Sequence, residues 1–142
     1  MNTAKLDQLF ADYEESFAQL DFKNIAMHYS DNFIGAGPKG SLVNNKKEFM
    51  ERVREASAFY ESIGQHSGRI ISIEVLHISN EYCMVTVHWA VKYHKTGDQE
   101  ISFDVSYIVQ EINDEMKIIL FISHEDEQEL IKSLGLLTAP AN

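Results

Sequence analysis

In the first half of the chain the apolar residues recur with the period of an α-helix. They fall three or four positions apart, which places their side chains on one face of a helix. This spacing predicts three helices, over residues 3–20, 21–29 and 45–63. Between the second and the third, Phe33 and Ile34 form only a short strand that leads into a glycine-rich segment.

In the second half, apolar and polar positions alternate, as they do in strands that bury one face. The alternation predicts four strands, over residues 69–78, 82–94, 100–112 and 116–124. Short turns join the strands, so they form an antiparallel meander. The segment HEDEQELIKSLGLL after the last strand is predicted to form a short helix. The chain is therefore predicted to be one α+β domain over residues 1–142, with three N-terminal helices packed on one face of the sheet.

Matching the apolar faces of neighbouring strands gives the predicted register, because a slip of one residue inverts every side chain. A three-residue loop at 96–98 pairs Trp89 with Val105, and a two-residue turn then pairs Tyr107 with Leu120. This register places on the inner face, among others, Trp89, Tyr107, Ile122 and His124.

The opposite face of the predicted sheet mixes apolar and polar side chains. Its members include Met84, Thr86, His88, Ile108, Ile119 and Phe121. This mixture is too apolar for a solvated face and too polar for a core, so it predicts an interface and a homodimer. The alternative is a solvated face that carries a few scattered apolar residues.

Charge and composition exclude several classes of partner. The formal net charge of −10 opposes binding to nucleic acid, because such binding depends on neutralising phosphates. No apolar run is long enough to span a membrane, and the N-terminus lacks the apolar core of a secretory signal. Cys83 is the only cysteine, which favours a reducing, cytoplasmic setting. No paired His and Cys spacing indicates zinc, so we expect neither a metal nor a cofactor.

Residues 35–40 read GAGPKG, which has the spacing of a dinucleotide-binding turn. Such a turn needs a helix that starts within it and backbone N–H groups that face phosphate. Here the third helix begins several residues later, and Pro38 has no backbone N–H. We therefore predict a turn that reverses the chain, with no nucleotide bound.

Two passages and the order of elements resemble a known family. YSDNFIGAGPKG is similar to a tyrosine, acidic turn, short strand and glycine turn of the nuclear transport factor 2-like superfamily, and FISHEDE resembles its last strand. The superfamily includes SnoaL-like polyketide cyclases and ketosteroid isomerase, and the resemblance covers roughly residues 3–124. It implies a cone-shaped fold with an internal pocket between a curved sheet and the helices, and a dimer. Because members include isomerases, cyclases, dehydratases, hydrolases and carriers, the resemblance implies no single activity.

On this sequence the implied pocket would be lined mainly by aromatic residues, which suits a small apolar or planar ligand. The expected lining residues are Tyr13, Phe17, Tyr29, Phe59, Trp89, Tyr107, Ile122 and His124.

Catalysis of the ketosteroid-isomerase type needs a base and hydrogen-bond donors near the developing oxyanion. His124 is the best candidate for an acid or base, with Tyr29 and Asp31 as further candidates. Each also has a structural interpretation: a strand-end histidine, a locally bonded tyrosine and a turn or cap residue. Asp104 falls on the outer face in the predicted register, away from the pocket.

Three hypotheses about function therefore stand at this point. The first is a small-molecule binding protein with an aromatic pocket and no covalent chemistry. The second is an isomerase, cyclase or dehydratase that uses His124. The third is a dimerisation or association module whose pocket is vestigial.

Overall fold

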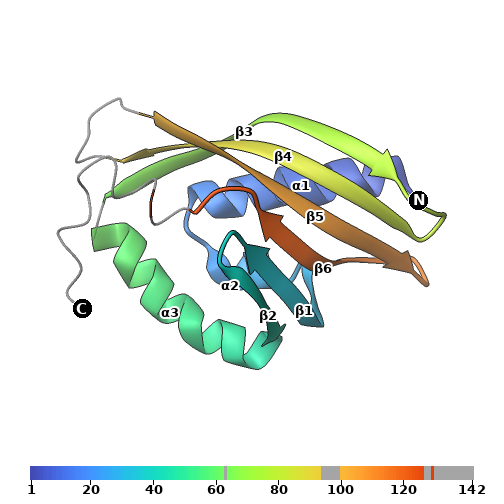
Figure 1. Ribbon diagram of the computed structural model, residues 1–142, viewed down its shortest axis with the longest axis horizontal. Coiled ribbons are helices and arrows are strands. Elements are labelled where there is room, and N and C mark those ends of the chain that lie inside the picture. Colours follow the sequence, from blue (N-terminus) through green and yellow to red (C-terminus); the bar gives the residue numbers. More distant parts are fainter. Residues whose placement is uncertain (63, 94–99, 127–128, 130–142) are drawn as a thin grey trace.

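The computed structural model describes residues 1–62, 64–93, 100–126 and 129, which form helices on one side of a six-stranded sheet (Figure 1). The helices are α1 (Thr3–Ala18), α2 (Phe22–Ala26) and α3 (Lys46–Ser62). The strands are β1 (Tyr29–Gly37), β2 (Gly40–Asn45), β3 (Gln65–His77), β4 (Tyr82–Tyr93), β5 (Glu100–Ile112) and β6 (Glu115–Ser123). The helix predicted in HEDEQELIKSLGLL and the loop predicted at 96–98 fall largely or wholly outside these residues.

Side-chain caps lie at all three helix starts, and at α2 the Asp21 side chain accepts the N–H of Asn24 (3.1 Å). The Asn2 side chain accepts the N–H of Lys5 (3.1 Å) at the start of α1, and the Asn45 side chain accepts the N–H of Lys47 (2.9 Å) at the start of α3. Each bond satisfies a backbone donor that has no partner within its helix. No helix in the described ranges is long and apolar enough to cross a membrane.

The sheet has the strand order β2-β1-β6-β5-β4-β3. The predicted meander corresponds to β3 through β6, but the sheet has two further strands, β1 and β2, where only the short strand at Phe33 and Ile34 was predicted. β1 and β2 form an antiparallel hairpin, and β1 runs parallel to β6. Tyr29, predicted at the end of the second helix, is the first residue of β1.

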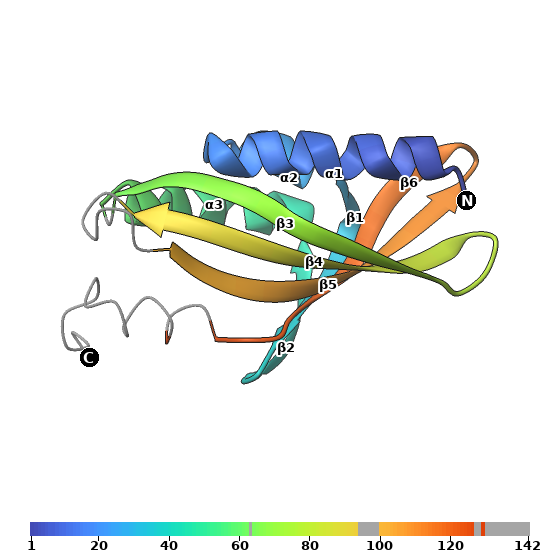
Figure 2. The ribbon, with the colours of Figure 1, turned by 90° about the horizontal axis from the view of Figure 1, so that it is seen from above.

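The three helices lie on one face of the curved, unclosed sheet, as Figure 2 shows from above. This arrangement confirms the predicted α+β fold of helices packed on a curved sheet. α1 packs across β3, where the ring of Phe17 lies directly over Gly68. A side chain at position 68 would meet that ring, so the glycine sets how closely the helix approaches the strand.

Strand β4 alternates as predicted, and its inner side chains form the centre of the core. Its buried inner members are Cys83, Val85, Val87, Trp89, Val91 and Tyr93. The register with β5 differs from the predicted one by two residues, because Trp89 pairs with Phe103 instead of Val105. A shift of two residues keeps every side chain on its predicted face.

A bulge in β6 corrects the predicted faces of that strand. Val109 pairs with Ile118 as predicted, but Ile108 then pairs with Leu120, so Ile119 is an extra residue. After the bulge, Phe121 pairs with Tyr107 and lies on the inner face. The predictions that Phe121 faces outward and that Ile122 and His124 face inward were therefore wrong.

Candidate functional site

An aromatic cavity of about 230 Å³ lies between the helices and the inner face of the sheet. Its wall consists of Tyr13, Phe17, Phe22, Ile25, Tyr29, Phe49, Trp89, Phe103, Val105, Tyr107, Phe121 and Ser123. The rings pack closely: the centroids of Phe17 and Trp89 lie 4.8 Å apart, and those of Tyr13 and Tyr107 lie 5.6 Å apart. Such a wall suits a small, planar, apolar molecule.

The structure brings most of the predicted lining residues together in this wall. Five of the eight are present: Tyr13, Phe17, Tyr29, Trp89 and Tyr107. Phe59 is half-buried against the core and does not line the cavity.

Two other predicted lining residues, Ile122 and His124, lie on the outer face of the sheet. Ile122 is 41% exposed there. His124 Nε2 lies 2.8 Å from the Ser106 hydroxyl, which in turn lies 2.8 Å from the Thr86 hydroxyl. The bulge at Ile119 explains both placements, because it reverses the alternation of the residues that follow it.

Sequence reasoning missed several residues of the wall. Phe103 and Val105 share the alternation of their strand with Tyr107, so the inner face of β5 already indicated them. Phe121 gave no such signal, because it lies in an unbroken apolar run, Ile118–Ile122. Whether Phe22, Ile25 and Phe49 reach the cavity depends on how α2 and α3 pack on the sheet, and the helical period of the sequence alone does not specify this packing.

Four side chains of the wall form a chain of hydrogen bonds. The Trp89 Nε1–H donates to the Tyr107 hydroxyl (3.2 Å), Tyr107 bonds to Tyr13, and the Tyr13 and Tyr29 hydroxyl oxygens lie 2.8 Å apart. Because an indole N–H can only donate, Tyr107 accepts from Trp89, whereas either hydroxyl can be the donor in the bond between Tyr13 and Tyr29.

Burial keeps these tyrosines neutral. It raises the pKa of Tyr13 and of Tyr29 well above the usual value for a tyrosine, since the charged form would lose its hydration. Both hydroxyls therefore stay protonated near neutral pH and serve as hydrogen-bond donors, not as bases.

The candidate carboxylates lie elsewhere. The side chain of Asp31 is 95% exposed and lies 3.8 Å from Lys46 Nζ, so its predicted place in catalysis does not fit the position of the cavity. Asp104 is on the outer face, as predicted, with its carboxylate 2.5 Å from His88 Nδ1. The described residues of the cavity wall include no carboxylate and no imidazole.

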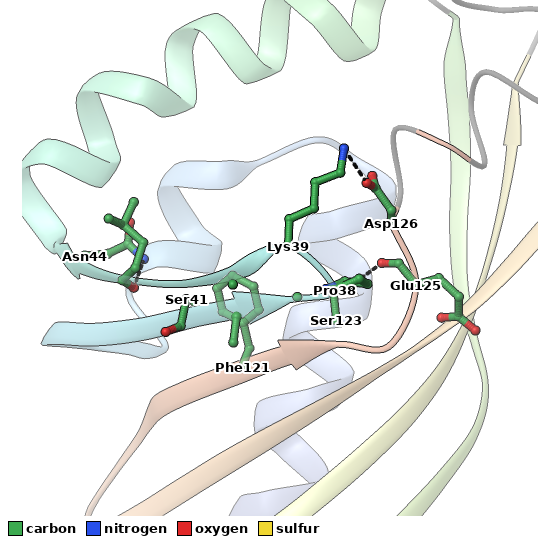
Figure 3. Close-up of a pocket in the computed structure, with 13 residues that line it drawn as sticks. Pro38, Lys39, Ser41, Asn44, Phe121, Ser123, Glu125 and Asp126 are labelled. Carbon is green, nitrogen blue, oxygen red and sulfur yellow. Dashed lines mark hydrogen bonds and ion pairs between the residues drawn. The ribbon is translucent and has the colours of Figure 1, made fainter.

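A second hollow, which we call the hairpin groove, has a volume of about 580 Å³ (Figure 3). It is lined by residues 35–42, Asn44, Phe121, Ser123, Glu125 and Asp126. GAGPKG forms the tip of the β1–β2 hairpin, where Gly37 pairs with Gly40. No helix starts in this turn, since α3 begins only at Lys46. The turn therefore lacks the strand-to-helix geometry of a dinucleotide site.

The outer face of the sheet carries a continuous apolar row across all six strands. Pairing partners in successive strands give the row Val43, Ile34, Leu120, Ile108, Met84 and Leu76. Val43 is 68% exposed and Leu76 is 58% exposed. Thr86 and His88 lie beside this row, as predicted, whereas Phe121 does not.

No group of three or more His, Cys, Asp or Glu side chains that could hold a metal occurs among the residues that the structure describes. The free thiol of Cys83 is buried, and burial raises its pKa. Neither observation indicates a metal centre or a reactive cysteine.

Fold and cavity together define a class of α+β proteins in which helices and a curved, unclosed sheet enclose an aromatic cavity. Residues 4–126 match the family model described as "NTF2-like protein (DUF6841)". The chain belongs to this NTF2-like family, which confirms the resemblance noted in its sequence.

Solved structures share the fold at low sequence identity. An NTF-2 like protein of unknown function from Shewanella oneidensis MR-1 is 21% identical, with a TM-score of 0.73 and coverage of 88% of this chain and 100% of its own. An NTF2-like protein of unknown function from Pseudomonas putida KT2440 is 11% identical, with a TM-score of 0.70 and coverage of 87% and 88%. A ketosteroid isomerase-like protein from Erwinia carotovora atroseptica SCRI1043 is 14% identical, with a TM-score of 0.62 and coverage of 83% and 91%. A comparison with curated proteins gives no match. These likenesses establish the fold and leave the activity to be argued from the site.

Proposed function

We propose that this protein binds a small, planar, largely apolar molecule that carries one hydrogen-bond acceptor. The observation that carries the proposal is the row of hydrogen-bonded hydroxyls of Tyr107, Tyr13 and Tyr29 in the wall of the aromatic cavity. A hydroxyl can donate one hydrogen bond and accept others, so a carbonyl or ether oxygen of a ligand beside these tyrosines can accept a hydrogen bond from one of them. The surrounding rings would hold the planar part of the ligand.

Binding without proton transfer accounts for the site better than an isomerase-type reaction does. That reaction needs a base beside the substrate, and the described cavity wall offers only neutral hydroxyls and an indole as polar side-chain groups. The enzyme hypothesis relied on His124 as the acid or base, but His124 bonds to Ser106 on the outer face of the sheet and so lies away from the cavity.

The test uses 2-acetylnaphthalene, whose ketone only accepts, and 2-isopropylnaphthalene, a similar shape without an acceptor. Tyr29→Phe is expected to weaken binding of the ketone by roughly tenfold and to leave the hydrocarbon unchanged, because it removes one hydrogen bond. Calorimetric titration measures both affinities. Trp89 is the only tryptophan and lies in the cavity wall, so quenching of its fluorescence reports occupancy there.

Tyr82→Phe is the matched control, since the Tyr82 hydroxyl bonds to Gln110 on the outer side of β4 and β5. The control should bind both probes as the wild type does. Absence of Trp89 quenching and of calorimetric binding with both probes would show that the cavity does not accept a ligand of this class.

We also propose that the outer face joins two copies of the chain. The apolar row crosses every strand of the sheet, and its ends at Val43 and Leu76 are exposed. A second copy would cover it with an identical row, as in a two-fold symmetric dimer. Polar neighbours such as Thr86 and His88 are typical of the rim of such an interface.

Ile108→Asp tests the dimer, because Ile108 lies at the middle of the row and outside the cavity wall. Sedimentation is expected to show a dimer for the wild type and a monomer for the variant, since the interface would then bury an unpaired carboxylate. Ile112→Asp is the control on the same strand and face, beyond the row, and should remain dimeric. A wild type that sediments as a monomer at micromolar concentration contradicts the proposal.

A further inference from the structure

The aromatic cavity and the hairpin groove adjoin each other. Phe121 and Ser123 line both, so the ring of Phe121 forms part of the partition between them. At about 230 Å³ the aromatic cavity is smaller than the range of about 300–1,000 Å³ that is usual for ligand pockets. A ligand of ordinary size would therefore extend beyond it, and the hairpin groove is the hollow next to it.

Two glycines explain why the groove is there. A Cβ at Gly35 would lie 2.7 Å from the ring of Phe121, so the absence of a side chain lets this ring lie against β1. A Cβ at Gly37 would make only an ordinary van der Waals contact, with Ser123 at 3.9 Å. The bare backbone of β1 is thus the floor of the groove, a role for the glycines that does not depend on a nucleotide.

The groove differs chemically from the cavity. Lys39 reaches Asp126 across it (2.9 Å), as Figure 3 shows. Ser41 and Ser123 also line it, and the Ser123 hydroxyl donates to the Glu125 carbonyl (2.9 Å). The Glu125 carboxylate accepts the backbone N–H of Asp104 (3.0 Å) and so is turned toward β5. The groove therefore offers a hydroxyl, exposed backbone and one ion pair, which suit a polar substituent. The net charge of −10 disfavours an anionic one.

We propose that the hairpin groove is the second compartment of the ligand site and holds an uncharged, hydroxyl-bearing arm of the ligand. This inference rests on the proposed function, in which the planar part of the ligand occupies the aromatic cavity. The arm passes Phe121 and lies along the backbone of Gly35 and Gly37. The natural ligand is then an elongated molecule with an apolar ring system at one end and a polar chain at the other.

The test compares 2-acetylnaphthalene with the same ketone carrying a diethylene glycol arm at its 6-position. We call the second compound the armed ketone. In the wild type it is expected to bind about tenfold more tightly than plain 2-acetylnaphthalene, because the diethylene glycol arm adds contacts in the groove. Gly37→Val fills the groove with three carbon atoms and touches no residue of the cavity wall except Ser123. It should abolish the advantage of the arm and leave binding of the plain ketone unchanged.

The outcomes separate this inference from the proposed function. If the plain ketone binds but the arm gives no advantage, or keeps its advantage in Gly37→Val, the groove inference is wrong and the proposed function stands. If neither ketone binds the wild type, both are wrong. A carboxylate-terminated arm should bind less tightly than the hydroxyl-terminated one, and equal or tighter binding contradicts the assignment of an uncharged arm.

A second measurement does not depend on a variant that folds. An armed ketone that ends in an amine-reactive ester is expected to label Lys39 in preference to the other lysines, because Lys39 lines the groove. Peptide mass spectrometry locates the label, and excess plain ketone should suppress it. Labelling of Lys39 no faster than that of the other exposed lysines contradicts the proposed path of the arm.

Discussion

Phe121→Asp is expected to lower the free energy of unfolding by roughly 3 kcal/mol, because it removes a large inner ring and places a carboxylate among aromatic side chains. The ring of Phe121 lies near Tyr29 (6.2 Å between centroids) and Phe33 (6.4 Å). Its loss would also join the aromatic cavity to the hairpin groove. Urea denaturation followed by circular dichroism measures the change.

The neighbouring variant Ile122→Asp is the matched control. Ile122 lies on the outer face and is 41% exposed, so its carboxylate remains hydrated and the stability should change by less than about 1 kcal/mol. The two neighbours thus test the bulge at Ile119. If Ile122→Asp were the more destabilising of the two, β6 would have the regular alternation and the opposite faces.

Gly68→Val is expected to cost about 2 kcal/mol of stability, because the new Cβ would lie 2.4 Å from the ring of Phe17. That ring packs on Trp89 (4.8 Å between centroids), so moving it disturbs the junction of α1 with the sheet. Gly37→Val should cost little, since its Cβ meets nothing closer than 3.9 Å. Neither glycine has the left-handed backbone conformation, so the comparison reports steric contact and not strain.

A double variant separates this contact from other effects. Phe17→Ala removes the ring, so adding Gly68→Val to it should cost almost nothing further. Thermal denaturation of the four proteins in the cycle gives the coupling between the two positions. Additive losses would mean that the ring of Phe17 is not what makes a side chain at position 68 unfavourable.

Much of the fold was predictable because, in most helices and strands, the spacing of the apolar residues fits only one type of secondary structure. β4 alternates strictly, and its inner residues, from Cys83 to Tyr93, are all buried. The error of two residues in pairing β4 with β5 did not change which face any side chain lies on, because side chains alternate between the faces with a period of two. The helices were predictable for the same reason, since their apolar residues recur with the helical period.

The errors arose where the pattern carries no information. The run Ile118–Ile122 is apolar throughout, so the sequence could not show where the alternation breaks, and His124 followed the wrong face. The β1–β2 hairpin contains glycines and polar residues with little alternation, so its strands were not recognised beyond Phe33 and Ile34. The bulge arises where β6 pairs with β5, and the hairpin joins the sheet where β1 pairs with β6. A local sequence pattern does not reveal either pairing.

The parallel pairing of β1 with β6 also has a consequence for the order in which the protein folds. β1 contacts the rest of the sheet only through β6, the last of the six strands along the chain. When residues 29–45 have left the ribosome, the strand that β1 pairs with in the sheet is therefore still missing, and that pairing must wait until residues 115–123 emerge. β3, β4 and β5 form through local turns, whereas closing the sheet spans most of the chain, the kind of contact that slows folding. Phe121 arrives with β6, so the wall of the aromatic cavity is completed only in this final step.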